Sequence, residues 1–127
     1  MFEVAVEYTF SAGHSLRHYK GKCENVHGHN YRIRIAVEGQ KLNAIGLLVD
    51  FVELKKNMRA VADRLDHQFI NDLEPFTILN PSAENIAKYF YDELHEGVKG
   101  APEQGTVRIA NVTVWETDTS IASYRPD

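Results

Sequence analysis

Alternation of apolar and polar residues predicts two β-strands near the start of the chain. Residues 2–10 carry large apolar side chains at every even position, with Glu, Ala and Thr between them, and Tyr31 to Val37 repeat this period of two. Such a period is typical of a strand with one buried face. We expect the two strands to pair as a hairpin through a long connection, residues 11–27. Connections of that length tend to carry function.

Two amphipathic helices are predicted in the middle of the chain. Asp50 is a suitable N-cap for the first helix, whose apolar stripe recurs every three or four residues, at Leu54, Met58, Val61 and Leu65. The second helix is predicted to begin at Ser82, directly after Pro81, and its stripe consists of Ile86, Phe90 and Leu94.

The last third of the chain returns to strands. Glycine and proline between residues 97 and 105 indicate a loop, after which Val107–Glu116 and Ile121–Arg125 are predicted strands joined by a turn. The apolar alternation slips phase near Ala110 and Asn111, which predicts a bulge there.

The predicted element order is therefore ββααββ. We expect an α+β fold in a single domain, 1–127, in which a four-stranded antiparallel sheet carries two helices on one face. Such a sheet leaves open edges that the protein has to cover or pair.

Length and charge narrow the class of protein. A chain of 127 residues can bury a core but is small for an isolated active-site cleft, so a neighbouring subunit often completes such sites. The net charge of −4 and the absence of a Lys/Arg block argue against a nucleic-acid partner. We find no signal peptide and no apolar run of membrane-spanning length, and therefore expect a cytoplasmic protein without a membrane partner.

The stretch from Cys23 to His29 holds the strongest chemical signal. His27 and His29 share one face of an extended strand and can reach the same ion, while Gly28 leaves room for close approach. His14, where the first strand-like run breaks into a loop, is the candidate third ligand. Three imidazoles form the ligand set of an open catalytic zinc site, although two histidines at this spacing can also be ordinary polar surface.

Cys23 is the only thiol in the chain, so no intrachain disulfide can form and a reducing compartment is indicated. Its neighbours Lys22, Glu24 and Asn25 are polar, which argues against a buried, inert cysteine. A lone thiol with His and Asp elsewhere in the chain is a candidate nucleophile or base.

Three further residues are candidates for chemistry. Asp66 and His67 end the first helix, either as a dyad in which the carboxylate makes the imidazole more basic or as a helix C-cap. Glu116 ends the apolar run that begins at Val112. It is either a solvated strand end or a carboxylate that binds adjacent N–H donors of a heterocycle.

Six motifs, in this order, resemble the 6-pyruvoyl-tetrahydropterin synthase / 6-carboxytetrahydropterin synthase family over nearly the whole chain. They are Phe10-Ser11-Ala12-Gly13-His14, Cys23-x-x-x-His27-Gly28-His29-Asn30-Tyr31, Gly46-Leu47-Leu48-Val49-Asp50-Phe51, Leu65-Asp66-His67, Asn80-Pro81-Ser82-Ala83-Glu84-Asn85 and Trp115-Glu116-Thr117. The resemblance implies a tunnelling fold (T-fold), in which sheet edges join into a trimeric barrel and two trimers stack into a hexamer.

The resemblance also implies roles for single residues and a substrate, 7,8-dihydroneopterin triphosphate. Zinc would act as a Lewis acid on the hydroxyl groups of the substrate side chain. This would make it easier for a thiolate to remove a proton next to these hydroxyls. By position, the implied zinc ligands are His14, His27 and His29, the catalytic thiol is Cys23, the relay pair is Asp66 and His67, and the pterin anchor is Glu116.

The branch of the family is predicted from one spacing. Three residues separate Cys23 from His27, which resembles the branch that makes 6-carboxy-5,6,7,8-tetrahydropterin for queuosine (7-deazapurine) synthesis and releases acetaldehyde and triphosphate. The pyruvoyl-forming enzymes, which eliminate triphosphate, usually carry a longer spacer. Some relatives have Glu where Val26 stands here.

Three alternatives stay open. One is the pyruvoyl-forming reaction. A second is a non-catalytic zinc protein in which Cys23 closes the metal site. The third is a binding module of the same fold that has lost its chemistry, against which the presence of Cys23, Asp66 and His67 speaks.

Overall fold

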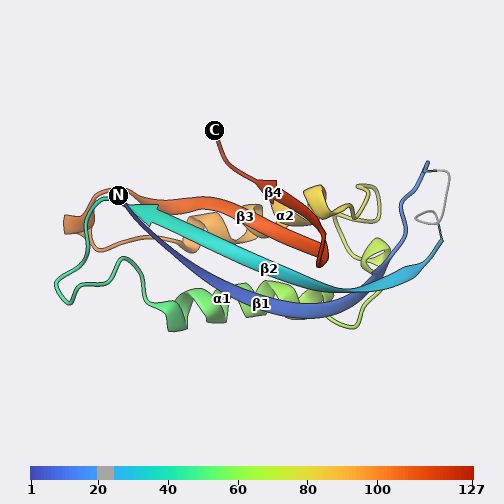
Figure 1. Cartoon of the computed structure of the whole chain (residues 1–127), viewed down its shortest axis with the longest axis horizontal. Coiled ribbons are helices and arrows are strands. Elements are labelled where there is room, and N and C mark those ends of the chain that lie inside the picture. Colours follow the sequence, from blue (N-terminus) through green and yellow to red (C-terminus); the bar gives the residue numbers. More distant parts are fainter. Residues whose placement is uncertain (20–24) are drawn as a thin grey trace.

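The computed structural model describes residues 1–19 and 25–127. It shows a four-stranded antiparallel sheet that is covered on one face by two helices (Figure 1). The strands lie side by side in the order β1-β2-β3-β4. The elements are β1 (Phe2–His14), β2 (His27–Gly39), α1 (Phe51–Leu65), η2 (Ile70–Asp72), α2 (Ala83–Leu94), η3 (His95–Gly97), η4 (Pro102–Gln104), β3 (Val107–Thr117) and β4 (Ser120–Tyr124). The predicted fold class and element order are confirmed.

Both long helices begin where the sequence predicts. The Asp50 carboxylate accepts a hydrogen bond from the N–H of Val52 at 2.8 Å, and the Ser82 hydroxyl accepts one from Asn85 at 3.2 Å. These caps satisfy N–H groups that the first turn of a helix leaves unpaired. Helix α1 then packs on β1, and α2 packs on β3 and β4. Neither of these helices, nor any other in the described part of the chain, has the length and apolarity to cross a membrane.

The predicted bulge lies in β3 at Ala110. Ala36 of β2 pairs with Asn111, whereas the next residue, Val37, pairs with Ile109, so the register passes over Ala110. One extra residue reverses the side-chain alternation. As a result, Ile109 faces the core together with Val112 and Val114. In a regular strand, an odd number of steps between residues would place them on opposite faces.

The connection between the first two strands is shorter than predicted. It spans residues 15–26, because β1 continues to His14 and β2 already begins at His27. The small residues 11–13 and Gly28 have low strand propensity and hide the alternation. Their backbone nevertheless continues the ladder until His14 pairs directly with His27.

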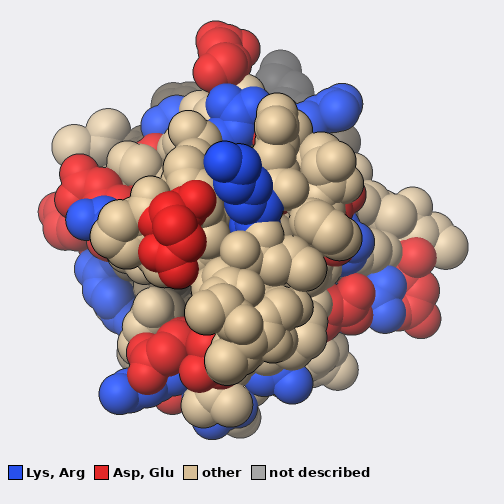
Figure 2. All heavy atoms as spheres, turned by 90° about the vertical axis from the view of Figure 1, so that its left-hand side faces the viewer, with Lys and Arg blue, Asp and Glu red and all other residues tan. Residues whose placement is uncertain are grey.

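Charged side chains are mixed at the end of the molecule where β2 ends and β3 begins. Figure 2 shows Lys and Arg next to Asp and Glu on this face, with wide uncharged areas between them. The face therefore lacks the concentrated positive field that a nucleic-acid backbone would need.

Candidate metal centre

The side-chain alternation that builds the core also brings histidines together at one end of the sheet. Phe10 is buried on the helix-covered face of β1, and His14, four residues on, has the same orientation. On β2 the same face carries Tyr31, then His29, then His27. Because β1 and β2 pair through His14 and His27, the three imidazoles meet.

Glu116 is the fourth member of this cluster. It lies two residues beyond the buried Val114 and therefore on the same face of β3. Its Oε1 atom lies 3.0 Å from Nε2 of both His14 and His29. The ligand atoms of all four residues are within 4.8 Å of one another. The sequence interpretation of Glu116 as a substrate anchor does not include this contact, because alternation along β3 indicates only the face on which Glu116 lies.

Hydrogen bonds to backbone carbonyls fix two of the histidine tautomers. Nδ1 of His14 lies 2.7 Å from the Pro81 carbonyl oxygen, and Nδ1 of His27 lies 2.7 Å from that of Asn25. Since a carbonyl only accepts, each Nδ1 carries the proton and each Nε2 presents a lone pair. The two Nε2 atoms are 2.9 Å apart, where facing lone pairs repel unless a cation or a proton lies between them. This arrangement is that of metal-ligating histidines.

Spacing and burial also fit a metal ion. Neighbouring ligands of a tetrahedral zinc ion with bonds of about 2.0 Å lie about 3.3 Å apart. The Nε2 of His29 is buried, and Glu116 Oε1, although 3.0 Å away, does not meet it with hydrogen-bond geometry. His14 is only 1% exposed. Burial lowers the pKa of His29, assisted by His14 and His27 and opposed by Glu116. The neutral form, which is the one that binds a metal, is thereby favoured.

Asp66 and His67 form a pair at the end of α1, as predicted. Nδ1 of His67 is 3.0 Å from an Asp66 carboxylate oxygen, which also accepts a hydrogen bond from the N–H of Ser11 at 2.9 Å. His67 has a φ of 58°, which is uncommon for a residue with a Cβ atom. This turn brings the chain to the outer edge of β1, where the His67 N–H donates to the Ser11 carbonyl at 2.6 Å. Asp66 also occupies the C-cap position of α1, so the contact between the two side chains lies directly at the end of this helix.

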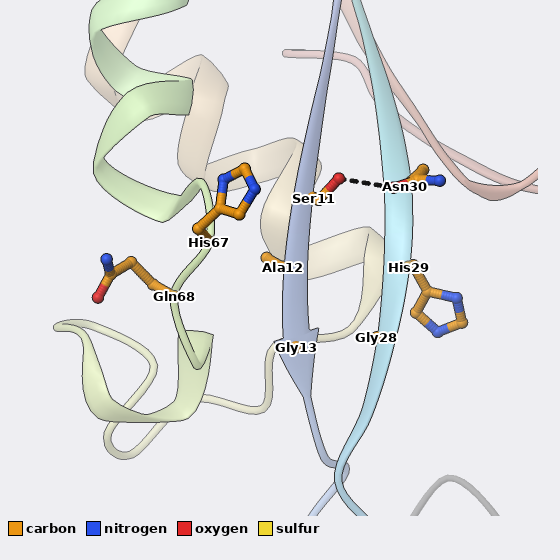
Figure 3. Close-up of a pocket in the computed structure, with 8 residues that line it drawn as sticks. All are labelled: Ser11, Ala12, Gly13, Gly28, His29, Asn30, His67 and Gln68. Atoms are coloured by element: carbon orange, nitrogen blue, oxygen red, sulfur yellow. Dashed lines mark hydrogen bonds between the residues drawn. The ribbon is translucent and has the colours of Figure 1, made fainter.

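The pair and the metal cluster lie apart within this chain. Figure 3 shows His67 and His29 on opposite sides of the β1–β2 pair, with the His29 ring directed away from the two strands. A hollow of about 400 Å³ is lined by both histidines and by residues 11–13, 28 and 30 and Gln68. The two groups are therefore separated by the β1–β2 pair, although one member of each borders the same hollow. Cys23 lies outside the described residues.

The 6-pyruvoyl tetrahydropterin synthase family matches residues 3–127. The 6-carboxy-5,6,7,8-tetrahydropterin synthase of Bacillus subtilis is 36% identical, over 98% of this chain and 86% of the relative. That of Synechocystis is 35% identical, over 98% of this chain and 93% of the relative. The structure of Caenorhabditis elegans 6-pyruvoyl tetrahydropterin synthase has a TM-score of 0.80 and 32% identity, and covers 100% of this chain and 98% of its own. This chain belongs to the 6-pyruvoyl tetrahydropterin synthase family.

Membership in this family confirms the resemblance inferred from the six motifs. The chain is an enzyme related to the 6-carboxytetrahydropterin synthases. Relatives with carboxy-forming and with pyruvoyl-forming names both align over nearly the full length.

We predict that Asp66 stabilises this synthase only while it is ionised. The N–H of Ser11, together with His67, lowers the pKa of Asp66. Its contribution is therefore full above the ordinary aspartate pKa of about 3.9 and is lost as the pH falls through the lowered value. Asp66→Ala should reduce the free energy of unfolding near neutral pH, and the difference from wild type should shrink in strong acid, as measured by urea denaturation. The exposed Asp118→Ala serves as control, and a difference that does not change with pH would contradict the prediction.

Proposed function

We propose that this enzyme converts 7,8-dihydroneopterin triphosphate and water to 6-carboxy-5,6,7,8-tetrahydropterin, with release of acetaldehyde and triphosphate, in queuosine (7-deazapurine) biosynthesis. The observation that carries the proposal is the cluster of three imidazoles and one carboxylate at the end of the sheet. The three-residue spacer between Cys23 and His27, and Val26 within it, favour the carboxy-forming branch. The names of the Bacillus subtilis and Synechocystis relatives support the same choice.

We infer that the metal is zinc and that His14, His27 and His29 hold it through Nε2. Bound zinc would supply a Lewis acid for the hydroxyl groups of the substrate side chain. The carbonyls of Pro81 and Asn25 keep two of the imidazoles in the ligating tautomer.

Glu116 is proposed to anchor the pterin ring. Its carboxylate can accept two hydrogen bonds from adjacent N–H groups of the heterocycle, a charge-assisted and therefore strong pairing. Its Oε1 atom lies 3.0 Å from Nε2 of His14 and His29, so a ring bound by this carboxylate would lie next to the proposed zinc ligands.

The remaining roles concern protons. Cys23, as thiolate, would remove a proton from the substrate side chain. His67 would relay protons, since its contact with Asp66 orients the ring.

We further propose a hexamer, a dimer of trimers, whose sites are shared between subunits. Asp66 and His67 lie at the outer edge of β1, across the β1–β2 pair from His29. The side of β1 that faces away from β2, at residues 2–10, pairs with no strand of the described residues, and neither does the side of β4 that faces away from β3. Exposed edges of this kind pair readily with a second copy, which would bring the dyad of one subunit towards the metal cluster of another.

The product decides the branch. Incubation of the purified protein with zinc and 7,8-dihydroneopterin triphosphate should yield 6-carboxy-5,6,7,8-tetrahydropterin and acetaldehyde, identified by mass spectrometry. A 6-pyruvoyl product would instead assign the chain to the other branch, and an unchanged substrate would refute the catalytic proposal.

Substitutions at Cys23 and Glu116 should have opposite effects. Cys23→Ala should retain zinc and substrate binding but lower kcat by about 10²-fold or more, the usual scale for loss of a positioned proton-transfer group. Glu116→Gln should mainly raise KM because a charge-assisted hydrogen bond is lost. Steady-state kinetics and zinc analysis of both variants test this, and near-normal turnover or loss of zinc in Cys23→Ala would show that the thiol has another role.

Mixed oligomers test whether the site is shared. His27→Ala should lose the metal and His67→Ala the relay, so each variant alone should be inactive. Co-refolding of equal amounts should restore about a quarter of wild-type activity, because random mixing pairs an intact cluster with an intact dyad at that frequency. The matched control, His27→Ala with His29→Ala, damages the same cluster in every subunit and should restore none. Absence of recovery in the first mixture would place both groups in one subunit.

A further inference from the structure

Two asparagines hold the chain immediately after the first histidine of the cluster. The Asn71 side chain accepts from the N–H of Ser15 and donates to the Ser15 carbonyl, both at 2.9 Å. The Asn80 side chain does the same for Arg17, at 2.9 Å and 3.0 Å. Each amide thus pairs with one residue through both backbone groups, as a neighbouring strand would. We call these four hydrogen bonds the asparagine clamp.

The clamp is anchored in the segment that also orients His14. Pro81, directly after Asn80, accepts the hydrogen bond from Nδ1 of His14 at 2.7 Å. The Asn80 carbonyl in turn accepts from the side chain of Asn85 at 2.9 Å, which ties it to the first turn of α2. The ring of His14 is therefore held by the Pro81 carbonyl. The backbone that follows it is held at Ser15 by Asn71 and at Arg17 by Asn80.

Arg17 strengthens the same attachment. Its guanidinium donates to the carbonyls of Phe76 at 2.8 Å, Leu79 at 3.3 Å and Asn71 at 3.4 Å. These three hydrogen bonds attach Arg17 to the same segments that carry Asn71 and Asn80. The position of Arg17 in the loop after His14 would also suit contact with an anionic substrate. Asn71 is 7% exposed, so its amide would remain unsatisfied without Ser15.

We propose that Asn71 and Asn80 are positioning residues of the metal centre, which set the orientation of His14 through the backbone of residues 15–17. The proposal rests on zinc binding by the cluster, as proposed above. Loss of either amide removes two of the four hydrogen bonds that restrain the backbone after His14, although the pairing of His14 with His27 and its hydrogen bond to Pro81 remain. The orientation of the imidazole is then less tightly restrained. Loss of groups that orient a ligating histidine typically weakens metal affinity about 10–100-fold.

The test measures zinc binding, without substrate, by competition between the apo-protein and a chromophoric chelator. Asn71→Ala and Asn80→Ala should each raise the zinc Kd about 10–100-fold. Cobalt substitution gives a second readout, in which the visible absorption of the bound ion should change as its ligand field changes. Should the buried Asn71→Ala not fold, Asn80→Ala, at a half-buried position, tests the same clamp.

Asn43→Ala is the matched control. The Asn43 side chain also accepts two backbone hydrogen bonds, from Ile45 and Leu47, each at 3.0 Å, but in the loop between β2 and α1. Its thermal stability should fall as in the clamp variants, while zinc affinity and the cobalt spectrum stay as in wild type. Wild-type zinc affinity in folded Asn71→Ala and Asn80→Ala, or an equal loss in Asn43→Ala, would overturn the proposal. A wild-type protein that binds no zinc would refute the proposed metal instead.

Discussion

The register between β1 and β2 is the constraint on which the candidate site depends. Phe10 stacks on Tyr31 with ring centroids 5.1 Å apart, and these two residues are partners in the ladder. Counting four residues outward along β1 and back along β2 leads from this pair to His14 and His27. A slip of one residue would turn each buried side chain of one strand to the opposite face. The core therefore fixes the geometry of the histidine cluster.

The polar end of the sheet has an energetic cost that a cation would offset. His14 is almost fully buried, and the hydroxyl of Tyr31, next to the cluster, is buried without a partner among the described residues. Burial and the nearby Glu116 carboxylate raise the pKa of Tyr31, which keeps the phenol neutral. Buried lone pairs and carboxylates that face one another are costly unless a cation or a proton lies between them. Metal binding should consequently add to the stability of the fold as well as to its chemistry.

The sequence was sufficient for the patterns that are local. The strands, both helix caps, the bulge at Ala110 and the shared face of His27 and His29 all follow from spacing over a few residues. The ends of β1 and β2 were misjudged, because small residues continue a strand only where a partner strand pairs with them. Contacts of Glu116 with His14 were also missed, since they depend on the register between three strands.

Long-range hydrogen bonds are the part of the site that no sequence pattern indicates. Asn71 and Ser15 are 56 residues apart in the chain, and no local spacing of residues indicates that they form a hydrogen bond. The position of the Asp66–His67 pair has the same origin. Spacing predicts that the two residues are adjacent, but only the hydrogen bonds to Ser11 place them on the outer edge of β1 rather than beside the histidines. The core-facing side of β1 carries both Phe10 and His14, while the outer edge of the same strand, at Ser11, forms hydrogen bonds with Asp66 and His67. One strand therefore positions both groups of candidate site residues, and the proposed oligomer would bring the two groups together.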